Sequence, residues 1–198
     1  MASRQSAFTR AAPDERRQSL IEATARCLAE RGAAGVSVRT ICAEAGVSPG
    51  LLRHYFAGVS DAIAEAYRWT GARVATALAD AVEAAGPDPR SRLLAYLTAS
   101  FRPPIADPEL LATWIAFWSL TRSDPAIGQV HQEIYRDFRH GIEVLVGEWR
   151  PGTDPRLPAV ALTALIDGLW LELSLGQAPF TPEEAERLVE LWLDGLLA

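Results

Sequence analysis

Residues 46–56, GVSPGLLRHYF, place side chains that can bind a nucleic acid on one short predicted helix. The guanidinium group of Arg53 can grip a guanine edge or a phosphate, and the hydroxyl of Tyr55 can donate to a phosphate oxygen. Gly50 has no side chain at the start of the helix, which lets the backbone of a partner come close. The chemistry predicted for this helix is the recognition of phosphates and base edges.

The residues around this helix predict how it is held. Ser37 can cap a preceding short helix at 38–45, and the chain then changes direction in a tight turn. Two short helices joined by a glycine-containing turn of about three or four residues are typical of a helix-turn-helix motif. Leu52 and Phe56 lie one helical turn apart, so they share the buried face of the second helix. The predicted DNA-binding residues are Ser37, Arg39, Thr40, Ser48, Pro49, Gly50, Arg53, His54 and Tyr55.

The net charge of −6 is divided unevenly along the chain. Residues 1–60 hold eight arginines and five acids, a charge of +3, whereas residues 61–198 hold eleven arginines and twenty acids, a charge of −9. A basic segment that coincides with a helix-turn-helix favours DNA binding over a three-helix bundle with a purely structural role. Residues 1–13 lack periodicity, and we expect a flexible basic arm there.

Pairs of a capping residue and a proline mark helix starts along the whole chain. The cap side chain accepts hydrogen bonds from free amides, and proline at the first helical position gives up no bond. The pairs are Ser48–Pro49, Asp88–Pro89, Asp107–Pro108, Asp124–Pro125, Asp154–Pro155 and Thr181–Pro182. We predict an all-α fold of about nine helices, at 14–31, 38–45, 49–56, 61–85, 89–101, 108–122, 125–149, 155–175 and 182–197.

Three parts are predicted on this basis. The arm at 1–13 precedes a DNA-binding head at 14–60, which contains the helix-turn-helix. Residues 61–198 form an effector-binding and dimerisation domain, and its first helix is the direct connection between head and body.

An acid in an apolar helix points to a candidate binding site in the body. Asp167 lies within VALTALIDGLWLELSL, where burial is costly unless the carboxylate is paired or faces a wet cavity. An arginine or backbone amides could pair with it, or a ligand could face it. Aromatic residues recur at helical spacing nearby, and each could instead belong to the core. The candidate effector-binding residues are Trp114, Phe117, Trp118, Tyr135, Asp167 and Trp170.

The last two predicted helices carry a candidate dimer surface. Small residues on the first of them allow close approach of another backbone, and large apolar residues on the second have little chain left to cover them. Closing the core of the monomer is the alternative role. The residues concerned are Ala161, Ala164, Gly168, Leu188, Leu191 and Trp192.

Signals for other classes of protein are weak. His131 and His140 do not have the spacing of metal ligands, and a solvated face is expected for both. No nucleophile elbow, P-loop or dinucleotide fingerprint occurs, so no enzyme activity, cofactor or metal is predicted. Cys27 and Cys42 are expected to be buried, reduced thiols. No apolar run reaches about 18 residues and no secretory signal opens the chain, which predicts a cytoplasmic protein.

The quoted segment and the preceding VRTICAEA resemble the DNA-binding head of TetR-family transcriptional repressors. The usual family pattern has Tyr where Arg53 stands and Lys where Val59 stands, so one phosphate contact is missing and Arg53 has a different role. In the body, TWIAFWSL and ALIDGLWLEL resemble the C-terminal domain of BetI-type repressors, which respond to choline.

The resemblance implies a homodimeric repressor that binds a palindromic double-stranded DNA operator and leaves it when a small molecule binds. Choline, or another quaternary ammonium or amine, is the effector that the resemblance suggests. A helical protein-interaction module, an activator and an effector-independent regulator are the alternatives.

Overall fold

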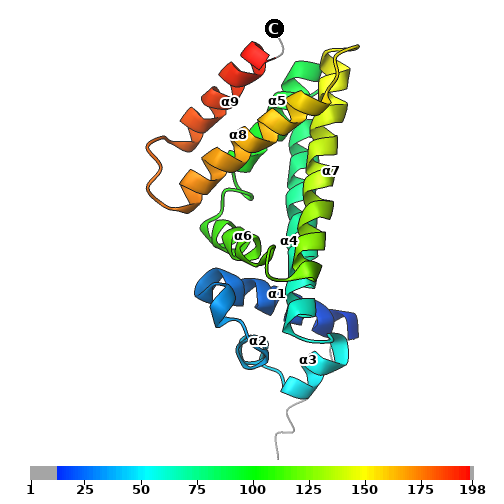
Figure 1. The fold of residues 1–198 in the computed structure, drawn as a ribbon, viewed down its shortest axis with the longest axis vertical. Coiled ribbons are helices and arrows are strands. Elements are labelled where there is room, and N and C mark those ends of the chain that lie inside the picture. The colour runs from blue at the N-terminus through cyan, green and yellow to red at the C-terminus, as the bar shows by residue number, and fades with distance from the viewer. Residues whose placement is uncertain (1–12, 197–198) are drawn as a thin grey trace, which may run out of the picture.

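The computed structural model describes residues 13–196, which fold into a small head and a longer helical body (Figure 1). The elements are α1 (Pro13–Arg31), α2 (Val38–Ala45), α3 (Pro49–Tyr55), α4 (Val59–Ala84), α5 (Pro89–Thr98), α6 (Pro108–Leu120), α7 (Pro125–Trp149), α8 (Arg156–Ser174) and α9 (Pro182–Leu196), with short 3-10 helices at Ala33–Gly35 and Ala99–Phe101. Within residues 13–196 no strand occurs, and the predicted all-α fold is confirmed. The predicted arm lies outside the described residues except for Pro13, which begins α1.

Most of the predicted capping residues cap the helices as expected. The carboxylates of Asp88, Asp107 and Asp124 each accept hydrogen bonds from backbone amides at the start of the following helix. Thr181 and Glu184 form the reciprocal capping box, with bonds of 2.9 and 3.3 Å. These starts follow directly from the sequence because a cap acts within one helical turn.

Two of the predicted caps differ from expectation. The hydroxyl of Ser48 makes no capping hydrogen bond at α3, so it stays available on the surface of the head. Helix α8 begins at Arg156, one residue later than predicted, because Pro155 is itself the capping residue and Asp154 accepts from the amide of Arg156 at 3.0 Å.

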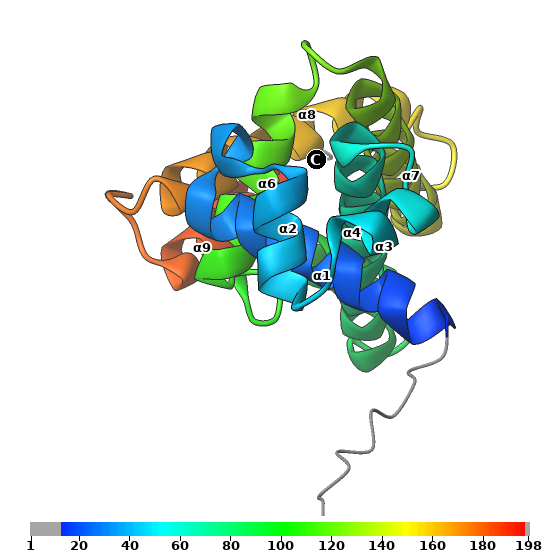
Figure 2. The same ribbon diagram turned by 90° about the horizontal axis from the view of Figure 1, so that it is seen from below.

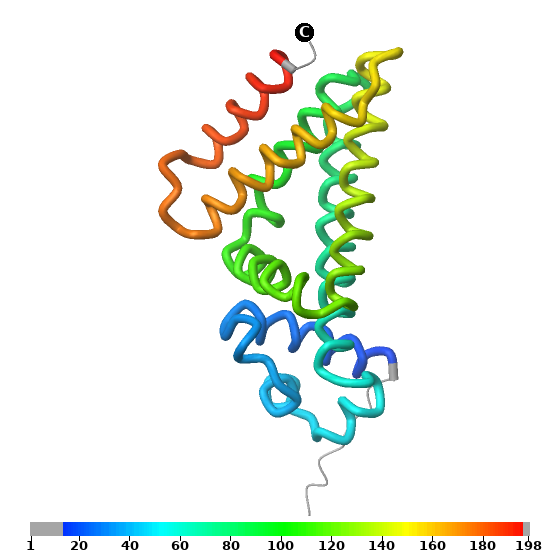
Figure 3. The backbone as a smooth tube through the Cα atoms, in the orientation of Figure 1, coloured from blue at the N-terminus to red at the C-terminus, as the bar shows by residue number. Residues whose placement is uncertain are grey.

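Two long helices form the axis of the molecule. Helices α4 and α7 run side by side over most of the body (Figure 3), and α4 continues from the head to the far end. Helices α8 and α9 pack together on one side of the body. Viewed from below, α1, α2 and α3 lie in front of the body helices (Figure 2). The head is therefore attached to the body mainly through α4 and through the packing of α1 on α6.

The apolar core is continuous from head to body. Leu52 and Phe56 are buried in the head, as the spacing predicted, and Tyr67 and Phe117 are fully buried at the junction. Cys27 and Cys42 in the head are buried, unbridged thiols, as expected. Burial is the main cause that raises the pKa of both thiols, which disfavours the reactive thiolate.

Candidate nucleic-acid interface and effector cavity

The helix-turn-helix is built by local hydrogen bonds that its sequence specifies. The hydroxyl of Ser37 accepts from the amide of Thr40 at 3.2 Å, and the amide of Ser37 donates to the hydroxyl of Thr40 at 2.8 Å. Helix α2 ends at Ala45, and the capping residue Gly46 has a φ of 66°, in the left-handed region that glycine adopts without strain. The start of α2 and its end at the turn toward α3 are thus both set by residues of this segment itself.

The structure brings the predicted DNA-binding residues to one exposed part of the head. Arg39 lies in the first turn of α2, Arg53 and His54 lie in the last turn of α3, and all three are exposed. Thr40 and Tyr55 are partly buried. The remaining members of the set are exposed: Ser37, Ser48, Pro49 and Gly50.

This exposed part of the head keeps a positive charge. Residues 32–60 contain a single acidic residue, Glu44, and it forms an ion pair with Arg26 at 2.7 Å. Among the described residues, no ion pair or hydrogen bond engages the guanidinium groups of Arg39 and Arg53. Two unengaged cations, one in the first turn of α2 and one in the last turn of α3, form a surface that attracts phosphate.

Gly50 provides a direct test of contact at this surface. A Cβ atom built on Gly50 meets Ser48 Oγ at 3.8 Å, an ordinary contact, so the fold does not require glycine there. We expect Gly50→Ala to leave the stability unchanged or raise it by up to about 1 kcal/mol, and to weaken operator DNA binding by crowding the approach of the backbone. Thermal unfolding and a gel-shift titration measure the two effects. Unchanged DNA affinity would exclude close approach at this position.

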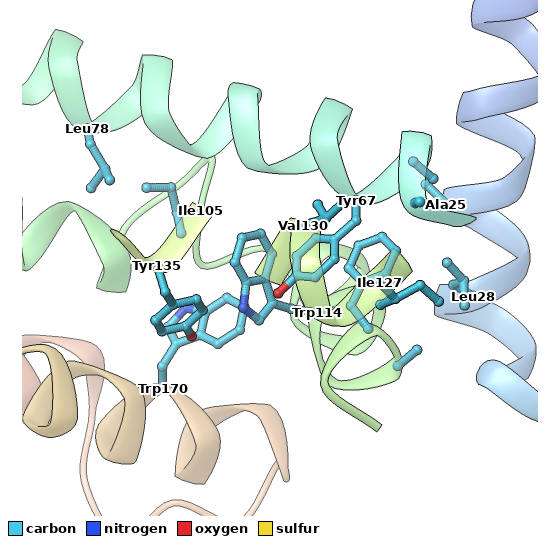
Figure 4. Packing of buried hydrophobic residues seen from close by; sticks show 14 of the residues in the cluster. Ala25, Leu28, Tyr67, Leu78, Ile105, Trp114, Ile127, Val130, Tyr135 and Trp170 are labelled. Atoms are coloured by element: carbon cyan, nitrogen blue, oxygen red, sulfur yellow. The ribbon is translucent and has the colours of Figure 1, made fainter. Parts of the chain in front are cut away.

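A second candidate site is a cavity of about 380 Å³ in the body. Helices α4, α5, α6, α7 and α8 and the short helix after α5 all contribute to its wall. Figure 4 shows Trp114, Tyr135 and Trp170 gathered together, with Leu78 and Ile105 on the side toward the far part of α4. We call this space the main cavity. Its volume falls within the range of about 300–1,000 Å³ that is usual for small-molecule sites.

Asp167 supplies a negative charge to the main cavity, whose lining also includes Glu133, Asp137 and Arg68. The hydroxyl of Tyr135 donates to Asp167 Oδ1 at 2.9 Å, so the partner is a phenol rather than the expected arginine or backbone amide. Burial raises the pKa of the Asp167 carboxyl to about 6, although the Tyr135 hydrogen bond and the nearby charge of Arg139 act in the opposite direction. At neutral pH the group is mostly ionised, and it faces a largely apolar space.

Aromatic rings surround this carboxylate. Trp114 and Trp170 meet edge to face, with ring centroids 5.8 Å apart. Trp170 Nε1 donates to the carbonyl oxygen of Ser100 at 3.1 Å, which fixes the position of the indole. The negative faces of such rings attract a cation, and the attraction grows when water is excluded.

Not all predicted effector residues line the main cavity. Trp114, Tyr135, Asp167 and Trp170 do, whereas Trp118 lines a more open neighbouring space, the side cavity, which Tyr135 and Asp167 also border. Trp118 Nε1 is the buried side-chain donor without a hydrogen-bond partner among the described residues. Phe117 is placed differently from the prediction. It lies in the core and stacks on Tyr67 of α4 with centroids 4.2 Å apart, because its position on α6 faces that helix.

Several wall residues carry no sequence signal of a binding site. Gly71, Val74 and Leu78 form the α4 side, and Tyr96 and Phe138 stack at a centroid distance of 5.4 Å. Gly71, Val74, Leu78 and Tyr96 follow the apolar periodicity of ordinary core, so the sequence does not distinguish them as cavity wall, whereas Phe138 could be expected to contribute to the site. The one available clue is Gly71, where a Cβ would come within 2.7 Å of Ile134 Cδ1 because α4 and α7 approach closely.

His131 connects the cavity wall with α4. It is partly buried rather than solvated as expected, and its Nδ1 shares a hydrogen bond of 2.9 Å with the Tyr67 hydroxyl. The ring of His131 also contacts Tyr135, with centroids 4.3 Å apart. Burial, and then the charge of Arg139, lowers the pKa of His131, so the imidazole is neutral near pH 7. His140 is 72% exposed, in line with the prediction.

Helices α8 and α9 expose a continuous series of apolar residues. On α8 they recur at intervals of three and four positions, so they lie on one side of the helix. We define the α8–α9 face by Leu157, Val160, Ala164, Gly168, Leu171, Leu175, Leu188, Leu191 and Trp192, all exposed. Of the candidate dimer residues, Ala161 is the one that is partly buried.

The apolar face also explains an ambiguous feature of α8. By length and composition Arg156–Ser174 could cross a membrane, with a mean hydropathy of 1.4 over its best window. Only 28% of that window is buried within the monomer. The apolar residues that remain exposed are those of the α8–α9 face, so a protein partner accounts for them as well as lipid does.

Family models match both parts of the chain. Residues 20–65 match the model of bacterial regulatory proteins of the TetR family, and residues 89–198 match the C-terminal model of BetI-type transcriptional repressors. The fold and the helix-turn-helix thus define a TetR-family regulator. The second match covers more than half of the chain, and the chain belongs to the BetI-type transcriptional repressors of this family.

Individual relatives agree with this assignment. The chain is 34% identical over 184 residues to the HTH-type transcriptional regulators BetI of Burkholderia lata and of Burkholderia cenocepacia strain J2315, covering 92% of this chain and 94% of each relative. A protein of Pseudomonas aeruginosa PAO1, described as a transcriptional regulator, is 41% identical with a TM-score of 0.87 over 98% and 96% of the two chains.

One structural neighbour was crystallised with a small molecule. A Saccharomonospora viridis protein, described as a transcriptional regulator in complex with choline, is 22% identical with a TM-score of 0.77 over 91% and 96% of the two chains. At this identity the likeness concerns the fold.

Proposed function

We propose that the protein is a homodimeric repressor that binds a palindromic operator through α3 and leaves it when a small cation occupies the main cavity. The carrying observation is that an ionised Asp167 lies among aromatic rings in a cavity walled by α4, which begins directly after the helix-turn-helix. This partly buried carboxylate has one hydrogen-bond partner, a phenol; Arg139 is near enough to lower its pKa, but among the described residues Asp167 lacks a directly paired cation. A cationic effector supplies it.

The chemistry of the cavity favours a quaternary ammonium or amine head. Aromatic faces attract a diffuse positive charge, and the carboxylate neutralises it beside a largely apolar wall. The structural neighbour crystallised with choline supports this class of ligand. Binding to DNA implies a cytoplasmic protein.

Effector and operator communicate through α4. Tyr67 in its first half bonds to His131, which contacts Tyr135, the partner of Asp167. Near its N-terminus, α4 is tied to α1 by the ion pair between Arg17 and Glu65. A ligand that moves the tyrosine and histidine side chains therefore changes the support of the head.

The decisive test is a thermodynamic cycle. DNA from upstream of the gene is titrated with protein in a gel-shift assay with and without cation, and the cation is titrated calorimetrically with and without DNA. We expect each ligand to weaken the other by the same factor, typically about 5–150-fold. Cation binding that leaves DNA affinity unchanged would indicate an effector-independent regulator. Absence of DNA binding at low ionic strength would indicate a protein-interaction module.

Dimerisation is proposed to use the α8–α9 face. A two-fold dimer places two α3 helices at half-sites about 34–36 Å apart, which matches a palindromic operator. We expect Leu191→Glu, at a side chain that is 70% exposed, to yield monomers without loss of fold and to abolish specific operator binding. Sedimentation velocity at micromolar concentration and gel-shift assays measure both.

A matched substitution separates this effect from a general effect of added charge. Val144 on α7 is also apolar and exposed, at 46%, but it lies outside the α8–α9 face. Val144→Glu should leave the dimer and its operator affinity intact. If Leu191→Glu remained dimeric, the interface would lie elsewhere.

A further inference from the structure

The main cavity is longer than a small ammonium ion requires. Its α4 wall runs from Arg68 to Leu78, a rise of about 15 Å along the helix. Its α7 wall runs from Val130 to Phe138, a rise of about 12 Å. Choline, a trimethylammonium group with a two-carbon alcohol, fills a small part of such a space.

Charge and apolar surface are separated within the cavity. Asp167 is in contact with Tyr135, and these two residues also border the side cavity, which marks one end of the space. Away from them the wall is mainly apolar, with residues such as Val74, Leu78 and Phe138. Three charged residues also line it, but Arg68 bonds to Glu65, Glu133 to Gln129 and Asp137 to Arg136. An occupant that fits has a charged end and an apolar end.

In the apolar part of the cavity, the packed side chains leave space unfilled. Tyr96 stacks on Phe138, and its hydroxyl donates to the carbonyl oxygen of Phe138 at 3.2 Å, so this phenol is engaged by the protein. Ala75 lines the cavity on α4 with a side chain too short to fill it. Empty apolar space forfeits dispersion contacts that an apolar group would regain.

We propose that the natural effector is an amphiphilic cation: an ammonium head at Asp167 joined to an alkyl or aryl tail of several carbon atoms that lies between α4 and α7 toward Leu78. This rests on the proposed function, since it specifies the effector of the same cavity. Choline itself is then a fragment of the ligand that the cavity accommodates.

A homologous series of cations tests the proposal. The full-length protein is titrated calorimetrically with tetramethylammonium, choline, and butyl-, hexyl- and octyltrimethylammonium below their micelle concentrations. Each buried methylene should raise affinity about threefold to fourfold until the tail reaches the end of the cavity. Hexanol, which has the tail without the charge, should bind far more weakly than hexyltrimethylammonium. Choline binding as tightly as the hexyl compound would overturn the proposal.

Two neighbouring exposed residues of α4 provide a matched pair of variants. Ala75 lines the main cavity, whereas Thr76 does not, and its hydroxyl bonds to the helix backbone at Ala72. Ala75→Trp should lower hexyltrimethylammonium affinity at least tenfold and change that of tetramethylammonium less than about twofold, because the indole occupies the space of the tail. Thr76→Trp should change neither. If Ala75→Trp lowered the affinity for both ions equally, the alkyl tail would not lie in this region.

The gel-shift assay separates failure of this inference from failure of the proposed function. If choline releases the operator at lower concentration than the longer cations, the repressor function stands and the amphiphilic ligand is rejected. If no member of the series binds, a cationic effector is rejected, and the amphiphilic ligand with it. Release at progressively lower concentration from choline to the hexyl compound supports both.

Discussion

Replacing Asp167 with asparagine should lower the affinity for any quaternary ammonium effector at least tenfold at pH 7.5. The substitution removes the ionised oxygen that neutralises the cation in a poorly solvated space, where charge interactions are strong. It keeps the shape of the side chain, and the hydroxyl of Tyr135 can still donate to the remaining carbonyl oxygen. Calorimetric titration with choline and with its neutral isostere, in which carbon replaces nitrogen, measures the effect. Only the charged ligand should lose affinity.

The same substitution should make the protein more stable. Because burial raises the pKa of Asp167 from 3.8 to about 6, ionisation opposes folding: the benefit of the neutral acid is complete below the unfolded pKa and is lost as pH rises through the folded pKa. At pH 7.5, Asp167→Asn removes this cost, which amounts to up to about 3 kcal/mol. Thermal unfolding at pH 7.5 and pH 5 should show a larger gain at the higher pH. A loss of stability at both would indicate that the carboxylate has a structural role.

The titration of Asp167 also predicts how effector affinity depends on pH. Affinity for a permanently charged cation should be constant at high pH and fall, approaching tenfold per unit, as pH drops below about 6. His131 and Arg139 border the side cavity next to Asp167, and a protonated His131 would add repulsion in the same direction. In Asp167→Asn, the dependence that remains comes from His131, so comparing the two proteins separates the groups.

Arg53→Ala is expected to have a similarly large effect on operator binding. A good bidentate contact from arginine to guanine contributes about 1–3 kcal/mol, and a dimer contains two copies, so the total loss is about 2–6 kcal/mol. That corresponds to at least a thirtyfold loss of affinity. The guanidinium group is exposed and has no partner within the described part of the chain, so removing it leaves the fold unchanged. Gel-shift titrations on operator DNA and on unrelated DNA separate the loss of sequence-specific affinity from the loss of non-specific affinity.

Arg136→Ala serves as the control because it removes one positive charge from the exposed surface of α7, where Arg136 pairs with Asp137 at 3.0 Å. It should leave operator affinity nearly unchanged. Arg53→Tyr, which restores the residue usual in the family, should bind DNA but with altered sequence preference. If Arg53→Ala and Arg136→Ala weakened binding equally, the effect of Arg53 would be one of net charge alone.

The features that were predicted best from the sequence are helix starts, because they depend on interactions within one helical turn. The caps at Asp88, Asp107, Asp124 and Thr181 marked helix starts correctly because the cap and its amide partners are neighbours in the chain. Ser48 was the exception, since a favourable residue type does not guarantee that the hydroxyl turns toward the helix.

The cavity was harder to predict because its wall comes from elements far apart in the chain. Asp167 was selected since an acid in an apolar helix is anomalous, and the aromatic spacing on α6 selected Trp114, which lines the main cavity. The same spacing could not show that Phe117 faces Tyr67 instead. Residues such as Val74 and Leu78 look like core in the sequence, and only the distance between α4 and α7 makes them cavity wall.

Because α4 is one uninterrupted helix, a small movement at the cavity would be transmitted to the head. The helix has 26 residues, so it is about 39 Å long, and it is a wall of the cavity and a support of the head at once. The stretch from Leu78 back to Val59 is about 28 Å long, so a tilt of about 5° near Leu78 would displace the head end by about 2.5 Å, a large part of the rise of a single base pair. In the proposed two-fold dimer the displacement would occur twice with opposite sense, so a small tilt of α4 at the cavity would put both reading helices out of step with DNA.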